Sequence, residues 1–181
     1  YRGPAAGSEP ETKAIQNYLN EHKTNLFIDW HSYSKLNMFP WGDTREHTKD
    51  HNAFKAIAEK FTTFNGYSPM QSIDLYPTTG TTDDHAYGAN GVAAFAIETG
   101  SSFHQSDDEY AKTLRENLPV LDYAVKIADA PFQRVFGPDA LDVVVDPATK
   151  RVSASLSDAH NGKQRLAGAE IVLDPAAAPG S

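Results

Sequence analysis

The sequence contains no cysteine, which excludes disulfide bonds and thiolate chemistry in these 181 residues. Basic residues are few, since 16 Lys and Arg stand against 24 Asp and Glu, and the formal net charge is -8. Nucleic-acid surfaces need clustered Lys and Arg, and the sequence has no basic stripe. We therefore expect no nucleic-acid partner.

Long apolar runs are also absent. No window approaches the roughly 18 consecutive apolar residues of a membrane-spanning helix, and the first residues have neither the basic nor the apolar region of a signal peptide. No G-x-S-x-G motif occurs, so the nucleophile elbow of a serine hydrolase is missing. The hydrophobic content of 40% and aromatic content of 10% are nevertheless sufficient for a buried core and argue against disorder.

Helices and strands are predicted to alternate up to about residue 130, which is typical of an α/β sheet. Ser8-Glu9-Pro10-Glu11 predicts a capping box before a helix of about four turns. The nearly continuous apolar run from Val92 to Ile97 predicts a strand covered on both faces. The other expected elements are strands over 26–31 and 71–75, a helix from Thr48 to Asn65, a turn or helix over 83–87, and a helix over 107–128 kinked at Pro119.

After Pro131 the pattern changes to short strands, predicted over 141–145, 152–156 and 169–173, with a turn over 146–150. We therefore predict two parts: residues 1–130, and a β-strand-rich extension or the start of an appended module over 131–181. Residues 174–181 have the composition of a tail or linker.

His31 is the last residue of a predicted strand, and a lone His in this position is more often a structural residue than a ligand. The segment from Phe27 to Gly42, FIDWHSYSKLNMFPWG, changes this view because it resembles the strand that delivers the third zinc ligand in the metallocarboxypeptidases. The resemblance implies that His31 binds zinc and that Ser32 and Tyr33 border the substrate cleft. Asp29 lies on the same strand face and could hydrogen-bond the imidazole, or form a plain surface salt bridge.

Glu98 ends the apolar strand, where loss of hydration raises the pKa of a carboxyl group that has no partner. Such a group suits a general base. The segment from Phe95 to Gly100 also resembles the family strand that ends in the catalytic glutamate. The alternative is a structural Glu in an ion pair.

The third segment, from Leu75 to Tyr87, resembles the mobile loop and specificity pocket of the same family. The resemblance implies that Tyr76 closes over the substrate and donates a hydrogen bond from its hydroxyl to the terminal carboxylate. It also implies that Asp83 selects C-terminal Lys or Arg, although Asp83 could instead cap a short helix. We expect Asp84 to act as a cap or structural residue.

His47 and His51 stand four residues apart, a spacing that could bind a metal on one helical face. Because Thr48 is the expected N-cap between them, we favour an exposed pair without a metal.

The resemblance covers about residues 1–130, with three segments in the family's order, and implies the C-terminal half of a zinc carboxypeptidase of the A/B/T-like type. The implied fold is part of a mixed α/β sheet with helices on both faces. The implied activity is removal of the C-terminal residue of peptides, with one Zn²⁺ ion, in a secreted enzyme. The partners would be peptide or protein C-termini, and also the missing N-terminal half.

The family's H-x-x-E ligand pair does not occur in residues 1–181, so we expect the other zinc ligands upstream of Tyr1 and no activity from this chain alone. Two alternatives follow. The chain could be a non-catalytic fragment that binds a partner through its sheet edge or its β extension. It could also come from a related zinc amidohydrolase that acts on cell-wall peptides.

Overall fold

The computed structural model describes residues 3–157, 165–169 and 171. The chain divides into two compact units, residues 1–135 and residues 136–181, and each is described by itself.

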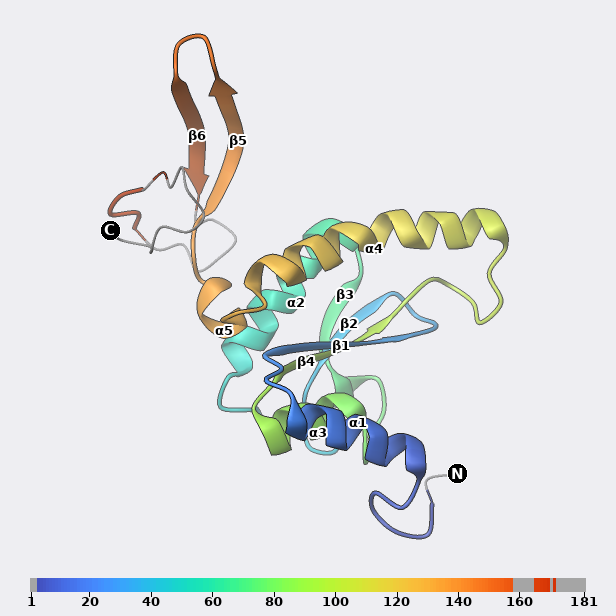
Figure 1. The fold of residues 1–181 in the computed structure, drawn as a ribbon. Coiled ribbons are helices and arrows are strands. Elements are labelled where there is room, and N and C mark those ends of the chain that lie inside the picture. The colour runs from blue at the N-terminus through green and yellow to red at the C-terminus, as the bar shows by residue number, and fades with distance from the viewer. Residues whose placement is uncertain (1–2, 158–164, 170, 172–181) are drawn as a thin grey trace. The chain divides into compact units, whose positions relative to one another are not determined.

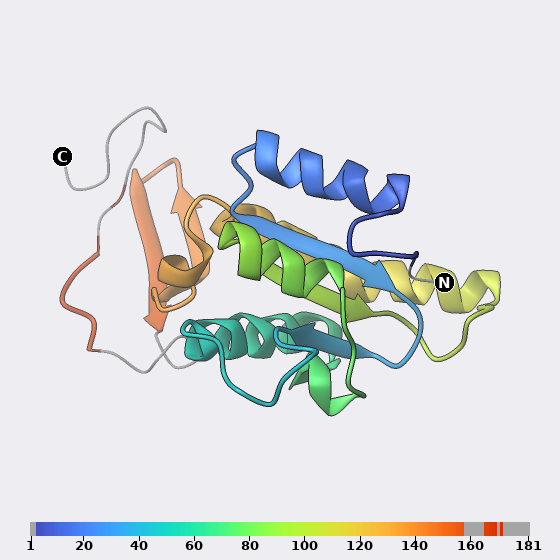
Figure 2. The same cartoon turned by 90° about the horizontal axis from the view of Figure 1, so that it is seen from below.

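The first unit is built on a four-stranded sheet in the order β1 (Leu26–His31), β4 (Ala93–Glu98), β2 (Leu36–Phe39) and β3 (Ser68–Gln71). Strand β4 runs parallel to β1 and antiparallel to β2, and β2 runs parallel to β3. Helices α2 (His51–Asn65) and α4 (Asp107–Ile127) cover one face, and α1 (Pro10–Glu21) and α3 (Thr82–Asn90) cover the other (Figures 1 and 2). The predicted mixed α/β sheet with helices on both faces is therefore confirmed.

The core lies between α2 and β4, one of the two inner strands of the sheet. Phe54, Ile57 and Phe61, which recur at helical spacing on α2, are fully buried. The rings of Phe54 and Phe61 lie 5.4 and 5.2 Å from that of Phe95 on β4. Complete burial of each such side chain contributes about 1.5–3 kcal/mol. β4 is covered on both faces, which explains its apolar sequence, and this packing fixes its position.

Helix ends differ from the prediction in two places. The capping box predicted at Ser8 does not form: α1 begins at Pro10 after an N-cap Glu9 without a side-chain cap, and the Ser8 hydroxyl donates to Glu9 Oε1 instead. Helix α2 begins three residues after the predicted N-cap Thr48, which is buried, and its N-cap is Asp50. Its predicted end at Asn65 is confirmed, because Gly66 takes the left-handed conformation, φ +72°, that glycine adopts without strain.

The strand predicted over 71–75 was misplaced. Residues 68–71 pair with β2 as the edge strand β3, and residues 72–74 form a short 3₁₀ helix, η1 (Ser72–Asp74). Pro69 has no amide hydrogen to donate, and an edge strand tolerates this. Helix α4 begins with a capping box between Ser106 and Glu109 and continues through Pro119 to Ile127.

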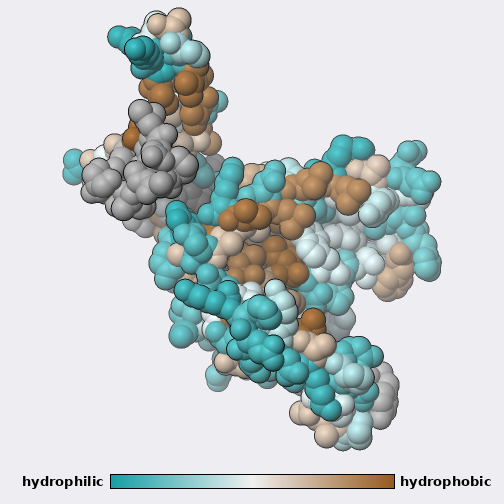
Figure 3. Space-filling view, viewed as in Figure 1, coloured by the Kyte–Doolittle hydropathy of each residue, from teal (hydrophilic) through white to brown (hydrophobic). Residues whose placement is uncertain are grey.

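One face of α4 carries exposed apolar side chains, with exposed fractions between 41% and 76%, along the surface seen in Figure 3: Tyr110, Leu114, Leu118, Leu121 and Val125. The first unit ends with α5 (Pro131–Arg134). Across the described residues, no helix is long and apolar enough to cross a membrane.

The second unit contains a β-hairpin of β5 (Asp139–Asp146) and β6 (Arg151–Ser157). Both strands and the turn between them were predicted. The Asp146 carboxylate stabilises the turn by accepting hydrogen bonds from the Ala148 and Thr149 amides. Of the third predicted strand, 169–173, residues 169 and 171 have no regular secondary structure and the remainder lies outside the described residues, as does the 174–181 tail.

Candidate active site

The site begins where two parallel strands end together. β1 and β4 are in register so that His31 lies beside Glu98, their last residues. Thr99 connects the two strand ends, because both its amide and its hydroxyl donate to the His31 carbonyl oxygen, at 2.8 and 2.9 Å. The carboxyl ends of strands in α/β sheets are the usual position of ligand sites.

A pocket of about 320 Å³ opens at this edge and contains four of the six predicted site residues: His31, Glu98, Tyr76 and Asp83. Ser32 instead lines an adjacent hollow with His31, Trp30 and residues of α4. Tyr33 is exposed, is not among the residues that line either hollow, and packs edge to face against Phe103, with ring centroids 4.7 Å apart.

Glu98 has the environment that its sequence predicts. Burial raises the pKa of its carboxyl group, and the Asp29 charge raises it further, while His31 opposes the shift. The buried Oε2 atom accepts no hydrogen bond from the described residues. The carboxyl group therefore faces the pocket with an oxygen free for a ligand or a proton.

The His31 imidazole lies against a carboxylate. Its Nε2 atom is 3.2 Å from Asp29 Oδ2, the contact expected from their positions on one strand face. The Thr82 hydroxyl donates to the same Asp29 oxygen. A carboxylate on one ring nitrogen orients the imidazole and leaves Nδ1 as the nitrogen that can act as a ligand.

The loop between η1 and α3 forms the opposite wall of the pocket. Tyr76 is exposed here at 59%. The hydroxyl oxygens of Thr78 and Thr81, which also line the pocket, are buried and have no hydrogen-bond partner among the described residues. These two hydroxyls were not predicted as site groups, since a Thr- and Gly-rich loop carries no signal that separates a pocket wall from a surface loop.

Asp83 and Asp84 do not cap α3, so the capping alternative is wrong for both residues, while the structural alternative for Asp84 agrees with its contact described below. The N-cap is Thr81, without a side-chain cap, and both carboxyl groups lie in the first helical turn. Asp83 is 2% exposed, lines the pocket, and accepts a hydrogen bond from the Ser72 hydroxyl at 3.0 Å. The Ser72 hydroxyl oxygen also lies 3.1 Å from the Phe39 carbonyl oxygen, so its one hydrogen is shared between these two acceptors. Sequence reasoning missed Ser72 because it was assigned to a strand.

Asp84 points away to a neighbouring loop. Both its oxygens accept from the Gly42 amide at 3.0 Å. Burial and, next, the negative charge of Asp83 raise its pKa to about 6. The Gly42 carbonyl accepts from the Thr78 amide at 2.8 Å, so Asp84 connects α3 to the pocket loop through one residue.

His47 and His51 stack with ring centroids 3.6 Å apart. His47 is exposed and His51, at the start of α2, is partly exposed. Burial and the neighbouring His47 and Lys55 lower the pKa of His51.

Comparison with known proteins bears directly on this site. The family described as zinc carboxypeptidase matches residues 1–119, which contain all of the pocket residues. The chain belongs to the zinc carboxypeptidase family. Its second unit lies outside the matched region.

Individual carboxypeptidases agree with this assignment. Rat mast cell carboxypeptidase A is 34% identical over 108 residues, which cover 54% of this chain and 26% of the relative. The human mast cell enzyme is 29% identical over 140 residues, which cover 70% of this chain and 33% of the relative. The chain therefore spans a quarter to a third of the length of these curated relatives.

A solved structure of bovine thrombin-activatable fibrinolysis inhibitor, bound to a tick carboxypeptidase inhibitor, matches with a TM-score of 0.62 and 26% identity. The match covers 70% of this chain and 49% of that chain. The sheet and helices of the first unit are thus part of the carboxypeptidase fold.

The family implies Zn²⁺, but the described residues do not form a complete zinc site. A catalytic zinc ion takes three protein ligands, and the described residues contain no group of three His, Cys, Asp or Glu side chains that could hold a metal. In the pocket, His31 supplies one imidazole, while Asp29 is already bonded to His31 and Thr82. Among the described residues, this pocket therefore contains one imidazole, that of His31, as the predicted zinc ligand.

Proposed function

We propose that the intact protein hydrolyses the last peptide bond of peptides and releases the C-terminal residue. The observation that carries the proposal is the convergence of His31, Glu98, Tyr76 and Asp83 around one pocket at the carboxyl ends of β1 and β4. These residues come from three separate segments, so their meeting in one pocket is not a consequence of proximity along the chain.

Glu98 is the proton carrier in this proposal. A carboxyl group with a raised pKa can take a proton from the attacking water and return it to the departing amine. Tyr76 donates a hydrogen bond from its hydroxyl to the terminal carboxylate of the substrate, and Ser32 and Tyr33 border the cleft. Asp83 favours a C-terminal Lys or Arg because a desolvated carboxylate discriminates in favour of a cation.

The proposed cofactor is one Zn²⁺ ion with His31 as one ligand and the remaining ligands from residues outside 1–181. The proposed partners are peptide or protein C-termini and the part of the protein that supplies those ligands, with no nucleic acid. Secretion is proposed from the family resemblance.

The direct test is Glu98→Gln in the intact protein. The amide is nearly the same size, so folding and metal content should be retained, whereas turnover should fall by roughly two to four powers of ten. Unfolding temperature and zinc content serve as controls. Near-normal turnover with zinc bound would show that another residue carries the proton, and turnover of cell-wall peptides alone would indicate an amidohydrolase.

A second candidate, a non-catalytic binding module, is favoured by one observation: the described residues supply an incomplete ligand set. Intact protein that binds peptides but neither retains zinc nor hydrolyses them would support this candidate.

A further inference from the structure

We propose that Tyr67 is a positioning residue for the site, because its hydroxyl group is bonded to the chain segment that follows Glu98 and lies in a cluster with the segment that follows His31. Tyr67 is not among the residues that line the pocket with His31 and Glu98. This inference rests on the proposed function only in its consequence for turnover, since the contacts themselves are a property of the fold.

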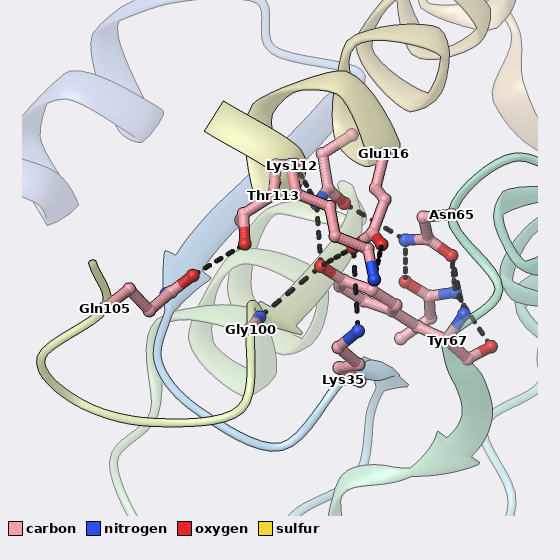
Figure 4. Close-up of polar contacts among 10 residues, drawn as sticks. Lys35, Asn65, Tyr67, Gly100, Gln105, Lys112, Thr113 and Glu116 are labelled. Atoms are coloured by element: carbon pink, nitrogen blue, oxygen red, sulfur yellow. Dashed lines mark hydrogen bonds and ion pairs between the residues drawn. The ribbon is translucent and has the colours of Figure 1, made fainter. Parts of the chain in front are cut away.

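Tyr67 precedes β3 and is 1% exposed. Its hydroxyl oxygen accepts from Asn117 Nδ2 at 2.9 Å and from the Gly100 amide at 3.4 Å, and it donates to Glu116 Oε2 at 3.2 Å (Figure 4). A phenol has one donor and two acceptor positions, so all three are used. Gly100 lies two residues beyond Glu98, and Tyr67 is thus connected to the end of β4.

The segment after His31 reaches the same cluster. Lys35 Nζ lies 3.8 Å from Glu116 Oε2 and 5.8 Å from the centroid of the Tyr67 ring (Figure 4). The Lys35 carbonyl accepts from the Ser68 amide at 3.0 Å. Together, Glu116 and Tyr67 therefore contact Lys35, in the segment after β1, and Gly100, in the segment after β4.

Gly100 is held from a second side. It has φ +70°, and a Cβ atom there would lie 2.4 Å from Gln105 Nε2, so the Gln105 side chain packs directly on its backbone. The Thr113 hydroxyl donates to Gln105 Oε1 at 2.7 Å and orients that side chain. Both supports of Gly100, through Asn117 and through Thr113, come from α4.

The backbone matters here because the buried Glu98 Oε2 atom accepts no hydrogen bond from the described residues. The direction of the side chain is then fixed by packing and by the backbone of Glu98, Thr99 and Gly100. Without the Tyr67 hydroxyl, the Gly100 amide loses its acceptor. A misplacement of about 1 Å at a reacting group can cost about a hundredfold in rate.

The test is Tyr67→Phe, with Tyr87→Phe as the matched control. Tyr87 is also a buried tyrosine, 6% exposed, and its hydroxyl donates to a carboxylate, Asp50 Oδ2, at 2.8 Å. We expect amide hydrogen exchange at Gly100 in residues 1–181 to rise at least tenfold in Tyr67→Phe and to stay unchanged in Tyr87→Phe. Exchange at Phe95, inside β4, should stay unchanged in both variants.

In the intact protein, Tyr67→Phe should lower kcat by about tenfold to a hundredfold with KM within twofold, as expected for misplacement of a reacting group. Tyr87→Phe should leave both constants within twofold. Should Tyr67→Phe not fold, Glu116→Ala removes the acceptor of the Tyr67 hydroxyl and the partner of Lys35, and should accelerate exchange at Gly100 in the same direction.

Unchanged exchange at Gly100, or an equal loss of kcat in Tyr67→Phe and Tyr87→Phe, would overturn the proposal. Wild-type protein that cleaves no peptide would refute the proposed function instead, and the exchange comparison would still decide whether Tyr67 holds the end of β4.

Discussion

At the residue scale, Asp83 combines a structural contact with a position in the pocket wall, which is the basis of the proposed selectivity. Its side chain is almost completely buried, yet it lines the pocket and accepts a hydrogen bond from Ser72. Burial removes water that would screen the charge, so an apolar substrate leaves that charge without a partner, whereas Lys or Arg provides one.

We predict that Asp83→Asn and Asp83→Ala in the intact protein lower kcat/KM for peptides that end in Lys or Arg by roughly tenfold to a hundredfold, the equivalent of about 1.5–3 kcal/mol. Peptides that end in Leu or Phe should be spared or improved. Asparagine can still accept from Ser72, so it separates the charge from the hydrogen bond. An equal loss for both substrate classes would mean that Asp83 only supports the loop.

At the scale of elements, the sequence predicted best where local pattern and tertiary environment agree. The strand over 26–31 was placed with both ends correct, and the apolar run from Val92 to Ile97 was correctly predicted as a covered strand. The third strand was misplaced because pairing with β2, which brings Pro69 and Met70 beside Asn37 and Met38, decides its position. Nothing in the local sequence contains that pairing.

The same contrast between local pattern and tertiary contacts applies to the candidate site. His31, Glu98, Tyr76 and Asp83 were identified through motifs, and they line one pocket. The contacts that hold the walls were not predicted, because they join residues distant in sequence: Ser72 to Phe39, and Asp84 to Gly42. Such anchors have no local pattern, since any residue with a hydrogen-bonding side chain can occupy them.

Asp84 gives a prediction about the connection between α3 and the pocket loop. Its pKa of about 6 lies above the ordinary 3.8, so the folded state binds a proton more tightly than the unfolded chain. This group therefore stabilises the fold fully below about pH 3.8, and the contribution is lost as the pH rises through about 6. Because the carboxyl group is only half-buried, we expect a contribution of about 1–2 kcal/mol.

Asp84→Asn keeps an acceptor for the Gly42 amide and removes the titration. The free energy of unfolding of the wild type minus that of Asp84→Asn, measured with urea in residues 1–181, should fall between pH 4 and pH 7 by about 1–2 kcal/mol. The control is the same measurement on Asp122→Asn, which removes a carboxyl group at an exposed position of α4. A flat profile for Asp84→Asn, or one that matches the control, would contradict the prediction.

At the scale of the whole molecule, the described residues form one side of a site. The sheet edge brings together an imidazole, a carboxyl group with a raised pKa and a buried aspartate around one pocket, and His31 is the predicted zinc ligand among the residues that line it. The chain spans a quarter to a third of the length of these curated relatives.

Zinc binding by residues 1–181 should therefore be weak. One imidazole cannot replace the three protein ligands of a catalytic zinc site, and a nanomolar Kd would require about 12 kcal/mol of binding free energy. Isothermal titration with Zn²⁺ should give weak uptake, and the unfolding temperature should not rise with added Zn²⁺, as it would if the folded state bound the ion tightly. His31→Ala tests whether any residual uptake comes from the pocket, and His51→Ala whether it comes from the stacked His47–His51 pair. Nanomolar one-to-one binding that His31→Ala abolishes would contradict the prediction and would mean that the pocket completes its ligand set from within these residues.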